Sequence, residues 1–323
     1  MKVLVTGIAG FIGFHAAKAF HDCGLDVVGV DNFNAYYDTS LKRARIKALP
    51  SQVKVVELDI ADHEALMALF KSETPDIVVH LAAQAGVRYS LEQPFAYAQS
   101  NLVGHLSVLE ACRHTPGLSH LVYASSSSVY GESDRAPFSE DQPVTAPVSL
   151  YAATKRADEL ISDSYAHLYG LKQIGLRFFT VYGRFGRPDM AYWLFTEKML
   201  KGQPIRLFNG GKMSRDMTHV SDVVDGVLAI VRKQPVFEIG ERTHRIYNIG
   251  NNRPEALETM VNTIEAAIGT QAERILEPMQ PGDVTRTCAD ISRISADYGY
   301  APQTPISEGL PDFVDWYRTF FDI

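Results

Sequence analysis

The residues of this sequence best suited to chemistry are Tyr151 and Lys155, in the stretch SLYAATKRADEL at residues 149–160. On a helix, side chains four positions apart lie on one face about one turn apart. A neighbouring ammonium favours the ionised form of a tyrosine, which makes Tyr151 a candidate general base. The same spacing also arises when a half-buried ring merely lies beside a solvated amine. The rest of the chain must therefore distinguish these two interpretations.

Composition limits the classes of protein to which the chain can belong. Its 323 residues, 46% hydrophobic and 21% charged, suit a globular protein with one large α/β domain or two lobes. A net charge of −7 argues against a nucleic-acid partner, which needs a dense basic face. No apolar run is long enough to cross a membrane, and MKVLVTG has no signal-peptide pattern, so no membrane partner is expected. Cys23, Cys112 and Cys288 are widely spaced, which predicts reduced thiols, a cytoplasmic location and no metal site.

Short apolar runs alternate with helical patterns through the first half of the chain. The predicted strands are 2–6, 26–30, 53–58, 77–82, 120–125, 173–178 and a returning strand at 245–250, and the predicted helices are 11–23, 62–72, 94–113 and 150–169. This alternation predicts an α/β fold, a Rossmann-type doubly wound parallel sheet with a smaller, mixed C-terminal substrate lobe. We expect residues 1–179, with a returning segment near 216–250, to form the domain of the large sheet. Residues 180–323 would mainly form a smaller lobe over the carboxyl ends of the strands, where such sheets bind their ligands.

A glycine-rich turn follows the first predicted strand. GIAGFIGFHAA places Gly7, Gly10 and Gly13 before a helix, where glycines permit a tight turn and close approach of a pyrophosphate. The helix N-terminus would offer free N–H groups to the phosphates. Asp31, at the end of the second strand, could accept hydrogen bonds from an adenosine ribose and repel a 2′-phosphate. These features favour NAD over NADP, although a plain turn and a solvated aspartate are the alternative.

Two further strand ends extend the predicted cofactor site. Asp59 and Ile60 follow the third strand, and HLAAQAGV ends the fourth with small residues that let a cofactor approach the backbone. Asn101 is a polar residue in an apolar helical stripe, which suits either a core amide or a functional group. The predicted cofactor contacts are Gly7, Gly10, Phe11, Ile12, Gly13, Asp31, Asn32, Asp59, Ile60, Leu81, Ala82, Ala83, Asn101, Tyr151 and Lys155.

The N-terminal glycines, SSSSVYG at 125–131 and YAATK at 151–155 together resemble the extended short-chain dehydrogenase/reductase family, over essentially the whole chain. In that family a hydroxyl residue, a tyrosine and a lysine form the catalytic group. The resemblance implies that Ser126, Tyr151 and Lys155 are catalytic here. It also implies that Lys155 holds the nicotinamide ribose and favours ionisation of Tyr151.

Longer motifs within the family narrow the activity. DNFNAYYDTSLKRAR at 31–45, SLYAATK, FFTVYGRFGRPDMA at 178–191 and GKMSRDMTHVSDVVDG at 211–226 are similar to those of UDP-glucuronate 4-epimerases. The resemblance implies reversible conversion of UDP-glucuronate to UDP-galacturonate through transient oxidation at C4 by tightly bound NAD. The implied substrate contacts are Arg88, Ser127, Ser128, Thr180, Arg187, Phe208, Asn209, Arg215, Asp283 and Arg286. Phe208 and Asn209 would lie near the uracil, and the last three near the ribose and diphosphate.

A uronate adds a chemical hazard. A ketone at C4 is β to the C6 carboxylate, and this arrangement loses carbon dioxide readily. An arginine binds a carboxylate in a planar bidentate geometry and could hold it out of alignment. Arg187 and Thr180 are the candidates, with Arg88 a third. Instead of binding the substrate, Arg184 and Arg286 could be ordinary surface charges. Thr180 could donate a hydrogen bond to its own backbone.

Related activities differ at the two residues after the catalytic hydroxyl. Dehydratases of this family carry Asp-Glu there and decarboxylases carry a glutamate two residues after it, whereas this chain has Ser127 and Ser128. An epimerase is therefore favoured. A 4-epimerase of a neutral UDP-hexose or UDP-N-acetylhexosamine, and a catalytically silent NAD-binding protein, are kept as alternatives. We also expect a homodimer, joined through helices 94–113 and 150–169.

Overall fold

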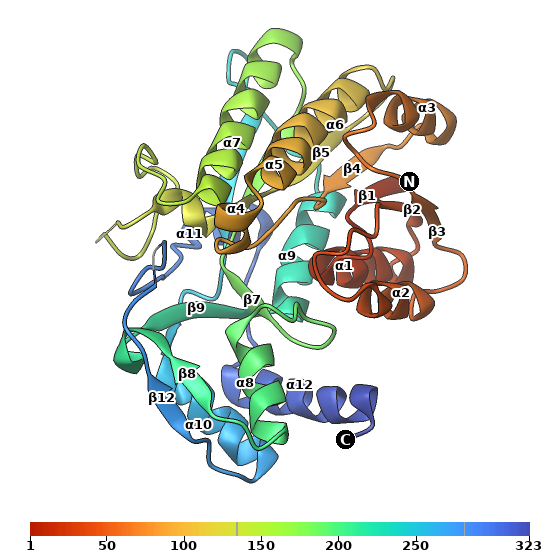
Figure 1. Cartoon of the computed structure of the whole chain (residues 1–323). Coiled ribbons are helices and arrows are strands. Elements are labelled where there is room, and N and C mark those ends of the chain that lie inside the picture. Colours follow the sequence, from red (N-terminus) through yellow and green to blue (C-terminus); the bar gives the residue numbers. More distant parts are fainter. Residues whose placement is uncertain (134, 281) are drawn as a thin grey trace.

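A seven-stranded parallel sheet forms the larger part of the protein (Figure 1). The computed structural model describes residues 1–133, 135–280 and 282–323. The strands lie in the order β10-β6-β5-β4-β1-β2-β3, which reverses direction beside β1 and is therefore doubly wound. Their bounds are β1 (Lys2–Thr6), β2 (Asp26–Asp31), β3 (Lys54–Glu57), β4 (Ile77–His80), β5 (His120–Ser126), β6 (Gln173–Phe178) and β10 (His244–Ile249). The predicted Rossmann-type fold is confirmed.

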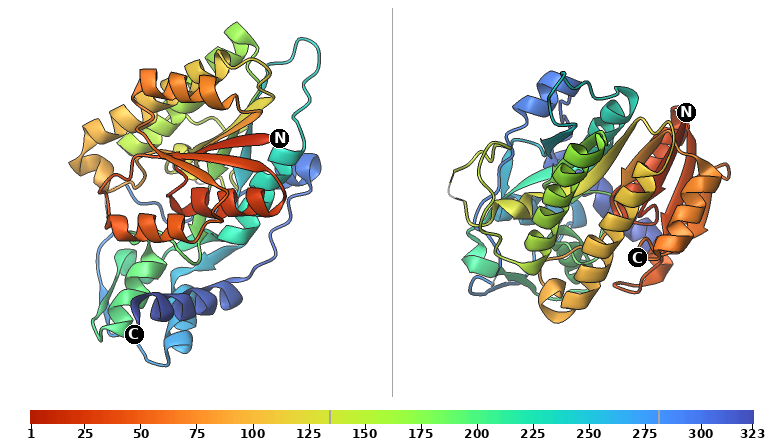
Figure 2. Two further views of the ribbon diagram at one scale, coloured as in Figure 1. Left: turned by 90° about the vertical axis from the view of Figure 1, so that its right-hand side faces the viewer. Right: turned by 90° about the horizontal axis from the view of Figure 1, so that it is seen from above.

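Helices cover both faces of this sheet (Figure 2). One face carries α1 (Phe11–Asp22) and α9 (Val220–Arg232), and the other carries α3 (His63–Glu73), α6 (Gly104–Arg113) and α7 (Leu150–Tyr169). The strand period of two places successive apolar side chains in opposite layers. Val3 and Val5 pack in the cluster of α1 and α9, whereas Leu4 packs in the cluster of α3 and α6. Short α11 (Ser292–Tyr298) contacts β10 and α9.

The helix predicted at 94–113 is not one regular α-helix, because a π-helical turn interrupts it. It consists of α5 (Pro94–Tyr97), a π-helical turn (Ala98–Val103) and α6. A π-turn adds a residue to the helical turn and changes the direction of the side chains around it. By contrast, α7 matches the predicted 150–169, since Ser149 caps its first turn and Gly170 ends it in the left-handed conformation. The helices α2 (Thr39–Lys47) and α4 (Tyr89–Glu92) were not predicted.

The smaller unit has its own sheets and its own core (Figure 1). Strands β7 (Thr180–Tyr182), β9 (Ser214–His219) and β11 (Pro254–Ala256) form a mixed sheet, and β8 (Ile205–Leu207) pairs with β12 (Arg274–Leu276). Aromatic side chains fill the space between α8 (Ala191–Leu200), α10 (Leu257–Ile268) and α12 (Ile306–Phe321), with Trp193 packed on Phe313 and Trp316. Short 3₁₀ turns cover Ser127–Tyr130 and Phe208–Gly211.

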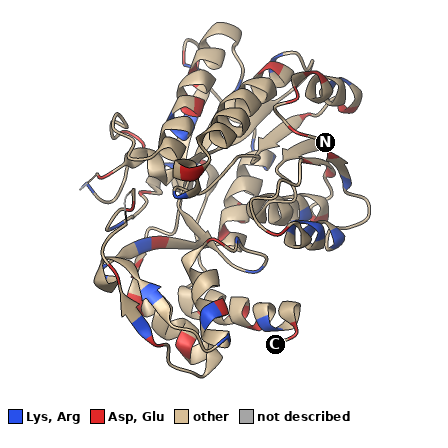
Figure 3. Ribbon diagram, in the orientation of Figure 1, with Lys and Arg blue, Asp and Glu red and all other residues tan. Residues whose placement is uncertain are grey.

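Charged residues of both signs are interspersed along the helices and strands, and no continuous basic face is visible in the view of Figure 3. In the part of the chain that the structure describes, no helix has the length and apolar character needed to span a membrane. Cys23, Cys112 and Cys288 are free thiols, and the last two are buried.

Candidate active site

A cavity of about 710 Å³ lies between the carboxyl ends of the parallel strands and the smaller unit. The ends of β1, β2, β4 and β5, the first turn of α7 and segments of the smaller unit line it. It brings together every residue that the sequence analysis assigned to the cofactor and the substrate, except Asn101, Asn209 and Arg286. One cavity therefore holds both predicted half-sites.

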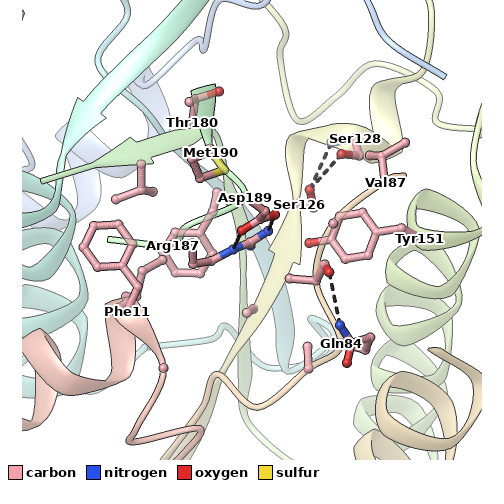
Figure 4. A pocket seen from close by; sticks show the side chains of 18 of the residues that line it. Phe11, Gln84, Val87, Ser126, Ser128, Tyr151, Thr180, Arg187, Asp189 and Met190 are labelled. Carbon is pink, nitrogen blue, oxygen red and sulfur yellow. Dashed lines mark hydrogen bonds and ion pairs between the residues drawn. The ribbon is translucent and has the colours of Figure 1, made fainter. Parts of the chain in front are cut away.

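The predicted catalytic group converges on this cavity from two adjacent elements. Ser126 is the last residue of β5, and its hydroxyl donates to Ser128 Oγ over 3.1 Å. Tyr151 is the second residue of α7, where capping by Ser149 fixes the start of the helix. Figure 4 shows Tyr151 and Ser126 facing the same space. A substrate hydroxyl in that space can contact both oxygens, as proton transfer requires.

Lys155 is anchored below Tyr151 rather than solvated. Its side chain is 3% exposed, and Nζ donates to the Ala124 carbonyl over 2.9 Å and to Asp158 Oδ2 over 3.1 Å. Asp158 is fully buried, and burial raises its pKa to about 6 although the Lys155 ammonium opposes the rise. The second carboxylate oxygen of Asp158 has no partner among the described residues. The ammonium therefore has a fixed position at the cavity wall, which excludes the interpretation of a solvated amine.

The glycine-rich turn has the close packing that a bound dinucleotide requires. A Cβ at Gly13 would lie 2.1 Å from the Gly7 carbonyl oxygen, so only glycine permits this contact between turn and helix. Gly10 is the N-cap of helix α1 and offers no side-chain hydrogen bond, and the first turn of the helix contains no acidic residue. The N–H groups of that turn are thus available to an anion. These residues fit the pyrophosphate of NAD.

Asp31 lies at the end of β2 and is held by the backbone. Its Oδ2 accepts the Ala9 N–H over 3.0 Å and its Oδ1 accepts the Phe33 N–H over 2.9 Å, which leaves further lone pairs on both oxygens. Asn32 donates to Asp59 Oδ2 over 2.9 Å. All three polar side chains line the cavity. This group of acceptors suits the hydroxyls of an adenosine ribose.

Asn101, predicted as a cofactor contact, is not among the residues that line the cavity. It lies in the π-helical turn and is 1% exposed. Its amide accepts the Gln84 N–H over 2.8 Å, and it donates to the Gln84 carbonyl over 3.1 Å and to Thr154 Oγ1 over 2.9 Å. Asn101 therefore uses its hydrogen bonds to tie the strand-end loop to α7, beside Lys155. These bonds position the cavity wall, and a contact with the cofactor stays a prediction.

Arg187 and Thr180 lie in the part of the cavity that faces Tyr151 (Figure 4). Arg187 is paired with Asp189: Nε donates to Oδ1 over 3.0 Å and Nη2 to Oδ2 over 2.5 Å. Burial favours the neutral forms of both groups, but the pair outweighs it, since the pKa of Arg187 is raised and that of Asp189 is lowered. Arg187 is thus a fixed cation whose Nε/Nη2 edge is already occupied.

Two other arginines of the cavity, Arg88 and Arg215, form a second group around Asp283. Arg215 approaches this carboxylate at 3.3 Å, and Arg88 approaches it at 3.8 Å. Arg88 also lies over the Phe208 ring, 4.9 Å from its centroid. Arg88 was a third candidate for the sugar carboxylate, but its contacts place it with the residues assigned to the nucleotide.

Two residues of the substrate prediction, Asn209 and Arg286, do not line the cavity, and neither does Arg184. Asn209 has a left-handed backbone and donates to the Lys212 carbonyl, so its amide stabilises the turn. Arg286 is exposed beside Ser214, outside the cavity. Arg184 pairs with Asp312 on α12, which agrees with the surface-charge interpretation.

The sequence analysis missed several residues that line the cavity. They lie on three segments: Asn34, Tyr36, Tyr37 and Lys42 after β2, Gln84 and Gly86 after β4, and Asp189, Met190 and Tyr192 after Arg187. The first segment belongs to the motif at 31–45, to which the sequence analysis assigned no side chain beyond Asp31 and Asn32. The motif itself was the available signal.

The chain belongs to the NAD-dependent epimerase/dehydratase family, whose model matches residues 3–250. An uncharacterised 37.6 kDa protein of Escherichia coli O111:H- is 47% identical, with all of both chains covered. UDP-glucuronate 4-epimerase 4 of Arabidopsis thaliana is 45% identical, over 99% of this chain and 76% of the relative. The crystal structure of UDP-glucuronic acid 4-epimerase from Bacillus cereus, in complex with UDP-glucuronic acid and NAD, superimposes with a TM-score of 0.91 at 33% identity, over 99% of this chain and all of that one. The family predicted from the motifs is confirmed.

Proposed function

We propose that this protein is an NAD-dependent UDP-glucuronate 4-epimerase that interconverts UDP-glucuronate and UDP-galacturonate. The observation that carries the proposal is a single cavity in which Arg187 and Thr180 lie opposite Ser126 and Tyr151. Relatives and structural neighbours that bear this activity in their names cover almost the whole chain. A cation opposite the base suits a uronate, since a neutral sugar would leave the guanidinium without a ligand group.

The residues of the cavity can carry out an oxidation and its reversal at one carbon. NAD, held by the glycine-rich turn, Asp31 and Lys155, would supply the acceptor for the C4 hydride and the donor for its return to the opposite face of the sugar. Tyr151 takes the C4 hydroxyl proton during the first step and returns it during the second. Ser126 donates a hydrogen bond to the same oxygen, and Lys155 holds the nicotinamide ribose. NAD is regenerated, so the reaction has no net redox change.

Carboxylate control is the second task of the site. The transient 4-keto uronate loses carbon dioxide when its C5–C6 bond aligns with the carbonyl. Arg187 and Thr180 bind the carboxylate and hold this bond out of alignment. The residues next to the catalytic hydroxyl are Ser127 and Ser128, which cannot act as proton-transfer acids near neutral pH. Asp189, the acid on this side of the cavity, is already bound by Arg187.

The remaining assignments follow from placement in the two units. Residues 1–179, together with a segment near 216–250, bind NAD, because β10 lies in the large sheet and α9 packs on α1. Residues 180–323 mainly bind the UDP-sugar, with Phe208 at the uracil and Arg215 and Asp283 at the ribose and diphosphate. The proposal includes a cytoplasmic location, which suits three cysteines that form no disulfide.

The proposed active form is a homodimer joined through α6 and α7. The two helices are neighbours, and they expose the apolar side chains of Leu106, Leu160 and Leu168 on the outside of the molecule. A second copy of the same face would bury them. Light scattering at micromolar concentration should show twice the chain mass of 35.8 kDa, and a monomeric mass would exclude this assembly.

The decisive experiment is incubation of the purified protein with UDP-glucuronate, followed by proton NMR of the products. UDP-galacturonate should form without free NADH. Parallel reactions with UDP-glucose and UDP-N-acetylglucosamine test the neutral-sugar alternative, and conversion of only these sugars would overturn the substrate assignment. Bound NAD with no reaction on any of these sugars would show a catalytically silent NAD-binding protein.

Tyr151→Phe should keep NAD and lose turnover. More than a few per cent of the activity in that variant would mean that another group takes the proton.

A further inference from the structure

The segment that follows β2 meets the loop of Arg187 at two points. This segment, residues 31–45, is far from the loop in sequence and belongs to the other unit of the fold. Arg45 in α2 binds the loop backbone before Arg187, and Tyr36 binds the Asp189 side chain after it. None of the assigned steps of the reaction uses either residue.

Arg45 is fully buried, at 0% exposure, and uses all of its N–H groups. Nε and Nη2 donate to the Phe185 carbonyl over 3.0 and 2.7 Å, and Nη2 also donates to the Gly186 carbonyl over 2.8 Å. Nη1 donates to the Ala9 carbonyl over 2.8 Å and to the Tyr37 hydroxyl over 2.6 Å. No acidic side chain pairs with Arg45 in the described ranges. A buried guanidinium without a counter-ion is costly unless every N–H is bonded, so this geometry is tightly specified.

The loop that Arg45 binds has a backbone that needs support. Phe185 has a φ of +56°, a left-handed conformation that a bulky residue adopts only when its surroundings impose it. Its ring packs on Phe14 and Trp316, with centroids 5.0 and 4.9 Å apart. Arg45 receives the carbonyls that this conformation presents. Arg187 follows Phe185 by two residues along the chain, so the position of its Cα atom depends on the hydrogen bonds from Arg45.

Tyr36 fixes the other end of the arrangement. Its hydroxyl donates to Asp189 Oδ2 over 3.1 Å, the same oxygen that accepts from Arg187 Nη2. Burial, with the nearby Asp189 charge, raises the pKa of Tyr36, which keeps the hydroxyl protonated as a donor. Gly86 closes the other side: a Cβ there would lie 2.7 Å from the Tyr36 hydroxyl oxygen. The Tyr36–Asp189–Arg187 chain is therefore held in one geometry.

This geometry determines which part of Arg187 can meet a substrate. Asp189 occupies the Nε/Nη2 edge, and Nη1 donates to no residue of the described chain. A sugar carboxylate must approach the Nη1 side of a cation that is already shared with another carboxylate. If Arg187 turned away from Asp189, the unpaired Asp189 carboxylate would repel the incoming sugar carboxylate. The placement of the guanidinium therefore matters in addition to its charge.

We propose that Tyr36 and Arg45 are positioning residues that hold Arg187 from both sides and thereby give the site its selectivity for a uronate. This inference rests on the proposed function. The two segments form one hydrogen-bonded unit across the boundary between the sheet and the smaller unit.

The test compares Tyr36→Phe with Tyr89→Phe. Both changes remove one hydroxyl from the same aromatic group, since the two rings lie 4.6 Å apart, but only Tyr36 contacts Asp189. Dissociation constants are measured for UDP-glucuronate and UDP-glucose with holoenzyme that also carries Tyr151→Phe, so that no turnover occurs. Tyr36→Phe should weaken UDP-glucuronate about tenfold, the loss of one ordered hydrogen bond, and change UDP-glucose less than about twofold. Tyr89→Phe should change neither.

Two further readouts separate positioning from general damage. With the catalytic tyrosine intact, Tyr36→Phe should release carbon dioxide and retain NADH in a larger fraction of turnovers, because a loosened Arg187 lets the carboxylate rotate. Arg45→Lys keeps the charge but cannot reach all of the carbonyls, and it should show the same selectivity loss. Its NAD content is measured as well, because Arg45 also binds the Ala9 carbonyl of the glycine-rich turn. If Arg45→Lys does not fold, the Tyr36→Phe results alone test the positioning role.

The outcomes distinguish this inference from the proposed function. A wild-type protein that does not epimerise UDP-glucuronate refutes the function. The positioning role is refuted if the wild-type protein epimerises UDP-glucuronate but Tyr36→Phe weakens the binding of both sugars equally, or of neither, and releases no additional carbon dioxide.

Discussion

The two halves of the cavity are built on different principles. On the cofactor side, contacts come from backbone atoms at strand ends and from a helix N-terminus, as at Gly7, Gly13 and Asp31, whose carboxylate is fixed by two N–H groups. On the sugar side, charged side chains bind one another, as in the pairs of Arg187 with Asp189 and Arg215 with Asp283.

The difference teaches how each half meets its ligand. A backbone site exists before the ligand arrives, and binding displaces little beyond water. A site of mutually paired charges must share or exchange its ion pairs with the incoming anion. We therefore expect substitutions on the cofactor side to act on the whole protein and those on the sugar side to act on particular substrate groups.

The largest effect should follow Gly13→Ala, the sharpest test of the rigid half. The new Cβ would lie 2.1 Å from the Gly7 carbonyl oxygen, a contact that only a backbone shift can relieve. We expect a protein that purifies without NAD and has no activity, measured from the nucleotide released on denaturation. Gly170→Ala is the matched control, because its Cβ meets nothing within 4 Å. That variant should lose only about 1 kcal/mol of stability and retain NAD. Normal NAD content in Gly13→Ala would contradict this description of the turn.

Arg187→Ala should have the next largest effect, restricted to the uronate. The loss of a charge-assisted contact, with Asp189 left facing the sugar carboxylate, should cost about 2–3 kcal/mol, or about 30- to 150-fold in kcat/KM. Carbon dioxide and trapped NADH should appear as by-products. The double variant with Asp189→Asn should recover part of the loss, and Thr180→Val should show a weaker form of it. Equal losses on UDP-glucose and no carbon dioxide would make Arg187 a structural residue.

Arg215→Ala should weaken all UDP-sugars alike, because the diphosphate is common to them. A partly buried arginine opposite phosphates contributes about 1.5–3 kcal/mol, so KM should rise roughly 10- to 150-fold and become less sensitive to salt. Arg274→Ala provides the control, since that arginine pairs with Glu265 outside the cavity. A loss confined to UDP-glucuronate would show that Arg215, too, binds the carboxylate.

The smallest effect concerns the stability of the sheet domain in mild acid. His105 and His120 are buried in the sheet domain, and burial lowers their pKa values from 6.5 to about 3 and about 4. The unfolded chain therefore takes up protons first, so this stability is complete above pH 6.5 and is lost as the pH falls toward 4. Each histidine should cost about 1 kcal/mol of unfolding free energy between pH 6.5 and 5.5. Urea titrations should show a weaker pH dependence for His120→Gln, and an unchanged one for His114→Gln, whose side chain is 52% exposed.

Local patterns in the sequence were sufficient for most of the sheet domain. The strand at 2–6 and the helix at 150–169 matched their predicted bounds, because buried runs and the caps at Ser149 and Gly170 are local signals. The strand at 244–249 was recognised as a returning one, but its place beside β6 follows from crossovers that only the folded chain shows. The π-helical turn at 98–103 had no local signal, and it placed Asn101 outside the cavity.

The sequence by itself determined the family, the fold class and most of the residues at the strand ends that line the cofactor side, since glycine spacing and strand ends are set by neighbours along the chain. The tertiary structure alone decided how the sugar side is arranged. Arg88 joins Phe208 and Asp283, Arg215 joins the same Asp283, and Arg45 holds a loop 140 residues away. A long charged side chain pairs with an oppositely charged group that lies near it in the folded chain, and this proximity cannot be read from the order of the residues.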